Sequence, residues 1–224
     1  SVIKSFLIET SISFKYIKQN NNGPSSARNN GILNSVGKYI ALLDSDDSFT
    51  PDSLYKKYQA IIENDVDFIY SDAFIIYEST VKRKKNTPKN FKEIYNNFYS
   101  SNVFENLLDK NFIPTTTVFC KKNLFEEYGF FNEQIIVAED YDLWLRFAIN
   151  ECKFLFLDEC LSYYSIRNNS LSQDQIRMNL QLIDILNSLY KFNISNNAKT
   201  KISKRIHNIQ FINVILEIFI LIKN

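Results

Sequence analysis

The sequence is poor in several residue types that define whole classes of sites. It has one histidine, His207, and three cysteines, none of which forms a C-x-x-C pair. We therefore expect no histidine-rich metal centre, no Ser-His-Asp triad, no zinc site and no disulfide framework. The formal net charge is only +1, which gives no general electrostatic attraction to nucleic acid, so no nucleic-acid partner is expected.

Long apolar runs are also scarce, although 45% of the residues are hydrophobic. The segment 209–222 is apolar apart from three polar residues, and it is too short to span a bilayer comfortably. It is interpreted as a packed or interfacial helix, which makes a peripheral membrane contact one expected partnership. The basic run 82–85 is interpreted as a solvated hairpin tip, with a contact to anionic lipid or acceptor as the alternative.

The length of 224 residues suits one domain with an appended helical piece. We place the domain at 1–172 and a C-terminal helical extension at 173–224. Strand-like and helix-like segments alternate, which predicts an α/β fold with a mostly parallel sheet flanked by helices. The predicted strands are 14–17, 39–43, 67–70, 73–77, 118–120, 154–157 and 161–165. The predicted helices are 25–35, 51–64, 121–128, 140–150 and 173–192, followed by 209–222.

Three carboxylates crowd into four positions at Asp44, Asp46 and Asp47, directly after the apolar run 39–43. Such a run is typical of a strand buried on both faces, and open α/β sheets bind ligands at the carboxyl ends of such strands. Like charges this close repel one another unless a cation lies between them. A divalent cation shared with substrate phosphates is the natural partner, and an ordinary solvated turn is the alternative.

A second acidic pair, Glu139 and Asp140, stands at the start of a predicted helix. The simple interpretation is that both carboxylates complement the positive end of the helix dipole. The functional interpretation is a general base held rigidly at the helix start. A helix N-terminus lowers a carboxylate pKa, so burial and the nearby acidic loop would have to raise the pKa of a base placed here.

Three segments, taken together, closely resemble family 2 glycosyltransferases, which are inverting enzymes of the GT-A fold. They are SSARNNG at 25–31, GKYIALLDSDD at 37–47 and EDYDLWLR at 139–146. The resemblance runs from about residue 14 to residue 172, and the order and spacing of the segments are those of the family.

The resemblance implies a donor side for the site. Asp46 would ligate Mg²⁺ or Mn²⁺ bridging the diphosphate of a nucleotide-sugar donor, and Asp44 would contact the ribose side of that donor. Arg28 and Asn29 match the helix that braces the D-x-D loop and are counted with the nucleotide-sugar-binding residues. Arg167 stands where the family often has histidine, and it would pair with the diphosphate.

The resemblance also implies an acceptor side. Asp140 matches the catalytic base, which would deprotonate an acceptor hydroxyl, and Glu139 is its acidic neighbour. Thr116, Thr117 and Trp144 are expected near the acceptor.

The implied function is transfer of a sugar, with inversion, from a UDP-sugar to a hydroxyl of a glycan or lipid-linked acceptor. The implied setting is bacterial surface polysaccharide biosynthesis, in the cytoplasm at the inner face of the membrane.

The family's opening strand and first helix are not found, so the chain is expected to begin partway through the domain. The absence of a Q-x-x-R-W motif argues against a processive synthase. The alternatives are a truncated, non-catalytic GT-A remnant and a sugar nucleotidyltransferase.

Overall fold

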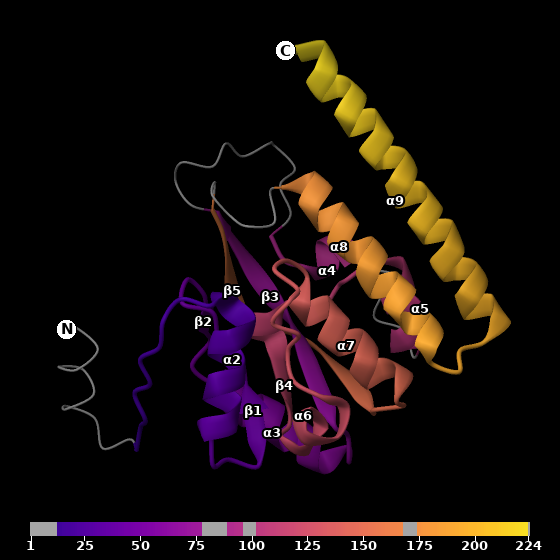
Figure 1. The fold of residues 1–224 in the computed structure, drawn as a ribbon. Coiled ribbons are helices and arrows are strands. Elements are labelled where there is room, and N and C mark those ends of the chain that lie inside the picture. The colour runs from indigo at the N-terminus through magenta and orange to yellow at the C-terminus, as the bar shows by residue number, and fades with distance from the viewer. Residues whose placement is uncertain (1–12, 78–88, 96–101, 168–173, 224) are drawn as a thin grey trace.

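The computed structural model describes residues 13–77, 89–95, 102–167 and 174–223 (Figure 1). The strands are β1 (Tyr39–Ala41), β2 (Ser48–Phe49), β3 (Phe68–Tyr77), β4 (Val118–Lys121) and β5 (Phe154–Ile166). The helices before β5 are α2 (Gly23–Asn34), α3 (Ser53–Glu63), α4 (Lys92–Tyr95), α5 (Val103–Asp109), α6 (Asn123–Tyr128) and α7 (Glu139–Ile149), with a 3₁₀ turn η1 (Thr115–Thr117). After β5 come α8 (Gln175–Ser188), a second 3₁₀ turn η3 (Leu189–Lys191) and α9 (Asn196–Lys223).

The strands of the described residues form one mixed sheet in the order β1-β4-β3-β5-β2. This confirms the α/β class, but the expectation of a mostly parallel sheet is corrected. Only β3 and β5 pair in parallel, whereas β1 with β4, β4 with β3, and β2 with β5 pair antiparallel. Strands β1, β3 and β5 do run the same way, but β4 inserts between β1 and β3 in the opposite direction and removes one parallel contact.

The two longest strands are continuous where the sequence pattern predicts breaks. Strand β3 joins the predicted strands 67–70 and 73–77, and β5 joins 154–157 and 161–165. The register between them shifts at Ser71 and Asp72, and such an irregularity places polar residues within a strand. The predicted strand at 14–17 is wrong, because these residues have no partner strand and form no regular structure.

Both faces of the sheet are buried, and successive residues of β3 point to opposite faces. Phe68 and Tyr70 belong to the large core beneath α5, α6, α7 and α8, whereas Ile69 belongs to a smaller core beneath α3. The same alternation recurs in β4, where Val118 and Phe119 face opposite cores. This period of two follows from strand geometry and explains why nearly every residue of these strands is apolar.

Helices α8 and α9 share the large core with the preceding elements rather than lying apart from them. Ile185, Leu186 and Ile202 are buried in the same cluster as Leu107 and Leu108 of α5. The predicted division at 172/173 stays a prediction, because residues 168–173 lie outside the described part.

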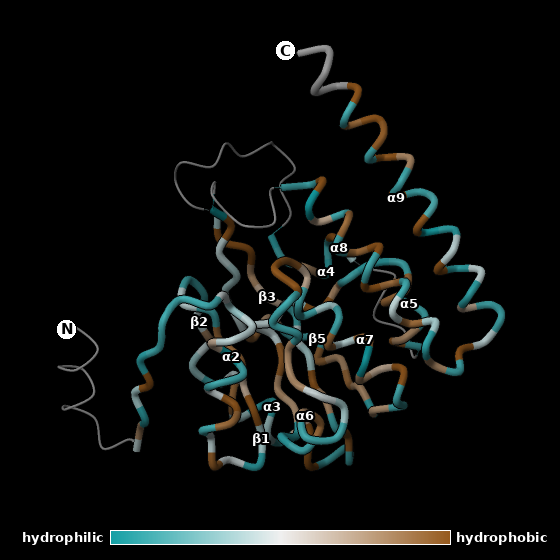
Figure 2. Tube along the Cα trace, in the orientation of Figure 1, coloured by the Kyte–Doolittle hydropathy of each residue, from teal (hydrophilic) through white to brown (hydrophobic). Residues whose placement is uncertain are grey.

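Helix α9 begins well before the apolar segment predicted at 209–222, and its C-terminal half reaches beyond α8 (Figure 1). Figure 2 shows that this half is largely hydrophobic, and Phe211, Val214 and Ile218 are exposed. Within the described residues, none of the helices is both long and apolar enough to cross a membrane.

Candidate active site

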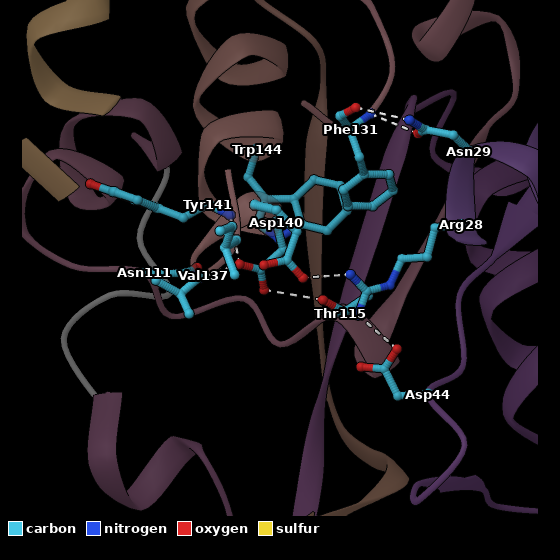
Figure 3. Close-up of polar contacts among 12 residues, drawn as sticks. Arg28, Asn29, Asp44, Asn111, Thr115, Phe131, Val137, Asp140, Tyr141 and Trp144 are labelled. Atoms are coloured by element: carbon cyan, nitrogen blue, oxygen red, sulfur yellow. Dashed lines mark hydrogen bonds and ion pairs between the residues drawn. The ribbon is translucent and has the colours of Figure 1, made fainter. Parts of the chain in front are cut away.

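Arg28 connects the two acidic segments that the sequence singles out. Its Nη2 donates to Asp44 Oδ1 at 2.7 Å, and its Nη1 donates to Glu139 Oε1 at 2.6 Å (Figure 3). The guanidinium also lies 5.3 Å from the centre of the Phe131 ring. Burial disfavours the charged guanidinium, but the two carboxylates outweigh burial and raise the pKa of Arg28. The helix α2 thereby ties the acidic loop to the start of α7.

Asn29 supports a loop instead of facing the ligand space. Its Oδ1 accepts from the backbone N–H of Phe131 at 3.0 Å, and its Nδ2 donates to the Phe131 carbonyl at 2.9 Å. Arg146 donates to the carbonyls of 128–130 in the same loop. Gly129 has φ +89°, and a Cβ there would lie 3.1 Å from the Arg146 guanidinium, so this turn favours glycine. The expected nucleotide-sugar contact of Asn29 is corrected to a bracing role, because the side chain is buried against this loop.

The acidic loop is held against β5 by two hydrogen bonds. Ser165 donates from its backbone N–H to Asp47 Oδ1 at 2.9 Å and from its hydroxyl to the Asp46 carbonyl at 2.6 Å. Burial and the neighbouring carboxylates of Asp46 and Asp44 raise the pKa of Asp47 to about 6. Asp47 therefore fixes the loop, and it lines the pocket together with Asp44 and Asp46.

Asp46 of the acidic loop pairs with an arginine at the pocket. Its Oδ2 lies 3.4 Å from Nε of Arg167, and both side chains line the pocket. Among the described residues, no group of three or more His, Cys, Asp or Glu side chains is arranged to hold a metal ion. The carboxylates of the acidic loop therefore do not form an all-protein cage for a metal. They fit a Mg²⁺ or Mn²⁺ ion that is held by one or two carboxylates together with substrate phosphates.

Asp140 is the best-oriented carboxylate in the site (Figure 3). Its Oδ1 accepts from the backbone N–H of Tyr141 at 2.7 Å and from Asn111 Nδ2 at 3.2 Å. Its Oδ2 accepts from the Thr115 hydroxyl at 3.1 Å. Three donors from two separate segments thus fix the orientation of one carboxylate at the pocket wall.

The surroundings of Asp140 raise its pKa to about 7. Burial is the largest cause, and the charge of Glu139 adds to it, while Arg28 and the Thr115 hydroxyl oppose the rise. A carboxylate with a pKa near neutrality can both take and release a proton at physiological pH, which is the property of a general base.

The acidic loop and the start of α7 face a single open pocket of about 1280 Å³. Sequence reasoning missed several residues of its walls, and these come from α4, the segment before η1, α8 and α9. They are Tyr95, Lys110, Asn111, Met178, Leu182 and Arg205. No local sequence pattern marks them, because only packing of distant segments brings them to the pocket.

Three residues predicted on the acceptor side do not line the pocket. Thr116, Thr117 and Trp144 are all fully buried, and it is Thr115 that reaches the pocket. In the 3₁₀ turn η1, successive side chains point in different directions, so only one of the three threonines faces the ligand space. Trp144 lies one helical turn deeper than Asp140, where its Nε1 donates to the Ile113 carbonyl at 3.1 Å. These three side chains pack in the core behind the pocket, and their place on the acceptor side stays a prediction.

Curated relatives carry glycosyltransferase names. An uncharacterized glycosyltransferase of Rickettsia felis is 35% identical over 134 residues, covering 60% of this chain and 21% of that protein. The Escherichia coli UDP-Glc:alpha-D-GlcNAc-diphosphoundecaprenol beta-1,3-glucosyltransferase WfgD is 29% identical over 158 residues, covering 67% of this chain and 56% of that protein. The chain thus spans only part of the length of either relative.

Solved structures share the fold. S. aureus TarS 1-349 in complex with UDP has a TM-score of 0.63 at 15% identity, covering 94% of this chain and 58% of that chain. The mannosyltransferase PcManGT from Pyrobaculum calidifontis, in complex with GDP-Man and Mn²⁺, has a TM-score of 0.63 at 13% identity, covering 95% and 56%. The GT-A fold expected from the resemblance is therefore confirmed.

The family assignment follows from the sequence match. The model of "Glycosyl transferase family 2" matches residues 1–129, which is more than half of the chain, and this stretch contains both Arg28 and the acidic loop. The chain therefore belongs to glycosyl transferase family 2.

Proposed function

We propose that this site transfers a sugar, with inversion, from a nucleotide-diphosphate donor to a hydroxyl group of an acceptor. The observation that carries the proposal is the meeting of two acidic clusters, far apart in the sequence, on one pocket with Arg28 between them. A base and a diphosphate-binding loop on facing walls are what a single displacement at an anomeric carbon requires.

The donor is a nucleotide sugar whose diphosphate lies against the acidic loop, and UDP is the nucleotide we favour. Two named proteins support this choice: WfgD uses UDP-Glc, and the TarS structure contains UDP. Asp44 serves the ribose side of the donor. Arg167, with its planar guanidinium at the pocket rim, serves the diphosphate.

Asp46 would hold a divalent cation, Mg²⁺ or Mn²⁺, beside the donor diphosphate. When bound, such a cation neutralises the charge that develops on the departing diphosphate. The PcManGT complex with GDP-Man and Mn²⁺ supports a metal in this fold.

Asp140 is the general base, and Asn111 and Thr115 orient it. It takes the proton of the acceptor hydroxyl as the hydroxyl oxygen bonds to the anomeric carbon. The bond from that carbon to the diphosphate breaks on the opposite face, and the electron pair leaves with the nucleoside diphosphate. One displacement of this kind inverts the anomeric configuration.

The acceptor is a glycan or a lipid-linked sugar of bacterial surface polysaccharide synthesis. The diphosphoundecaprenol in the name of WfgD supports the lipid-linked class. The exposed apolar half of α9, with Phe211, Val214 and Ile218, would place the pocket near a lipid surface at the inner face of the membrane. The basic run 82–85, interpreted as a solvated hairpin tip with a lipid contact as the alternative, lies outside the described residues.

Two measurements test the proposal. Calorimetry with UDP and Mn²⁺ tests the donor side alone, and Asp46→Asn should weaken UDP binding in Mn²⁺ much more than in its absence. Transfer from radiolabelled UDP-sugars to lipid-extract acceptors tests the whole reaction, and Asp140→Asn should abolish transfer while UDP still binds. Asp52→Asn, which changes an exposed carboxylate paired with Lys56, is the matched control. Unchanged transfer in both Asp46→Asn and Asp140→Asn would exclude the proposed roles.

A further inference from the structure

The Gln181 side chain of α8 forms hydrogen bonds with the backbone just before α7, the helix that carries Asp140. Its Oε1 accepts from the N–H of Ile136 at 2.7 Å and from the N–H of Val137 at 3.0 Å. Two successive backbone donors therefore converge on one side-chain oxygen. Backbone donors in such a partly buried segment are costly to leave unpaired, so this contact defines where the segment lies.

The next residue in the chain, Ala138, has a strained backbone. Its φ of 62° and ψ of 28° fall in the left-handed region, which residues with a Cβ rarely adopt. Ala138 is also the N-cap of α7, and no side chain caps the helix there. A residue in this conformation persists only when the surrounding structure holds it. The Gln181 contact immediately before it is such a restraint.

The restraint affects the orientation of Asp140, the proposed base. Helix α7 starts at Glu139, so the direction in which the helix leaves the 136–138 segment sets where the Asp140 carboxylate points. The Asp140 carboxylate must meet donors from Asn111 and Thr115, which stand on a different segment. A shift of the 136–138 segment would therefore misalign these contacts.

The geometry points to Gln181 as a positioning residue that holds the strained turn at Ala138 and thereby aims Asp140 at the acceptor hydroxyl. This inference rests on the proposed role of Asp140 as the base. Helix α8 thereby takes part in positioning the proposed base. Gln181 lies beyond residues 1–129, the stretch that the family model matches.

The test compares Gln181→Met, which keeps the side-chain length but removes the acceptor, with Gln181→Glu, which keeps an acceptor oxygen. The matched control is Gln175→Met, on the same helix, where the lost contact is a hydrogen bond to Asn179. We expect Gln181→Met to lower kcat about 10- to 100-fold with little change in KM for the donor, because misplacement by about 1 Å costs this much. Gln181→Glu should recover most of the rate, and Gln175→Met should resemble the wild type.

A second variant separates positioning from general stability. Adding Ala138→Gly to Gln181→Met should restore part of kcat, because glycine adopts the left-handed region without strain. Amide hydrogen exchange of 136–137 should accelerate in Gln181→Met and stay slow in Gln175→Met. Hydrogen exchange does not depend on turnover, so it tests the contact between Gln181 and the 136–137 backbone even if the chain transfers no sugar. In that case only the proposed function fails. An unchanged exchange rate at 136–137, or an equal loss of kcat in the Met and Glu variants, would overturn the inference.

Discussion

Replacing Arg28 by methionine removes the cation that pairs with both acidic segments. The change leaves the Glu139 carboxylate, whose side chain is only 12% exposed, without its partner. Breaking a buried ion pair by removing one partner costs about 3–5 kcal/mol. Asp44 is 36% exposed, so water screens it and its share is small. We therefore work from the lower end of the range, and the lost contact with the Phe131 ring adds about 0.5–1 kcal/mol. The expected loss in the free energy of unfolding is about 3–4 kcal/mol.

The assay is urea unfolding followed by circular dichroism at pH 8, with the slope of the transition compared between variants. Lys56→Met is the control, because Lys56 pairs with Asp52 and Glu159 at the surface, where solvent screens the charges and its removal should change stability little. Arg28→Lys should fall between these two, since one ammonium cannot replace a guanidinium that bridges two carboxylates. An Arg28→Met protein within about 1 kcal/mol of the wild type would refute the bridging argument.

The same substitution has a second, independent signature in the pH dependence of the reaction. Arg28 opposes the rise of the Asp140 pKa, so its removal lets that pKa climb above about 7. A general base acts in its deprotonated form, and the acidic limb of the kcat/KM profile should therefore move to higher pH. An acidic limb that stays in place would show that Arg28 does not act on the base.

Three further substitutions are expected to have measurable effects. Asp140→Asn should stabilise the fold by about 2 kcal/mol at pH 8 and by little at pH 4, as judged by thermal unfolding at both pH values. The sign follows from the raised pKa of Asp140: the folded state holds a proton between about pH 4 and pH 7 that the unfolded state has released, so the wild type loses stability as pH rises through this window. Thr115→Val should move the acidic limb of kcat/KM to higher pH, since the hydroxyl stabilises the charged Asp140, whereas Thr117→Val should leave the limb in place because that hydroxyl donates to the Pro114 carbonyl. Lys57→Met should stabilise the fold by about 2 kcal/mol more at pH 6 than at pH 10, because burial without a hydrogen-bond partner lowers the pKa of Lys57 from 10.5 to about 7. The penalty for burying this lysine is full below about pH 7 and declines as pH rises towards 10.5, where the unfolded chain also loses the proton.

The parts of the site that sequence reasoning found are those with a local chemical signal. The carboxylates at Asp44 and Asp46 follow an apolar strand, and Glu139 and Asp140 open an amphipathic helix. Both patterns are complete within a dozen residues, and the structure places all four side chains on the pocket. Arg28 was expected as a brace of the acidic loop and as a nucleotide-sugar-binding residue, and the structure shows the two carboxylates that it joins.

The parts that sequence reasoning missed depend on direction and on long-range packing. Periodicity places Trp144 on an apolar helix face, but it does not tell whether that face meets a ligand or the core. A run of three threonines does not reveal that Thr115 alone turns towards the pocket. Arg205 reaches the pocket only because α9 packs back against α5, where it donates to the Leu108 carbonyl at 2.8 Å. Contacts of this kind are properties of the folded chain.

The pKa of a carboxylate at a helix start is subject to opposing influences, and the arrangement around Asp140 shows how they balance. The helix N-terminus and the three hydrogen bonds that Asp140 accepts favour the charged form, whereas burial and the charge of Glu139 disfavour it. Arg28 is paired with Glu139 rather than with Asp140, so the base is partly relieved of its neighbour's charge without forming an ion pair of its own. A direct pair with Arg28 would lower the pKa of Asp140 and hold its oxygens away from a hydroxyl group. Placing the cation one residue away keeps the base near neutrality, oriented and available, which is why the Glu139–Asp140 order matters to the proposed chemistry.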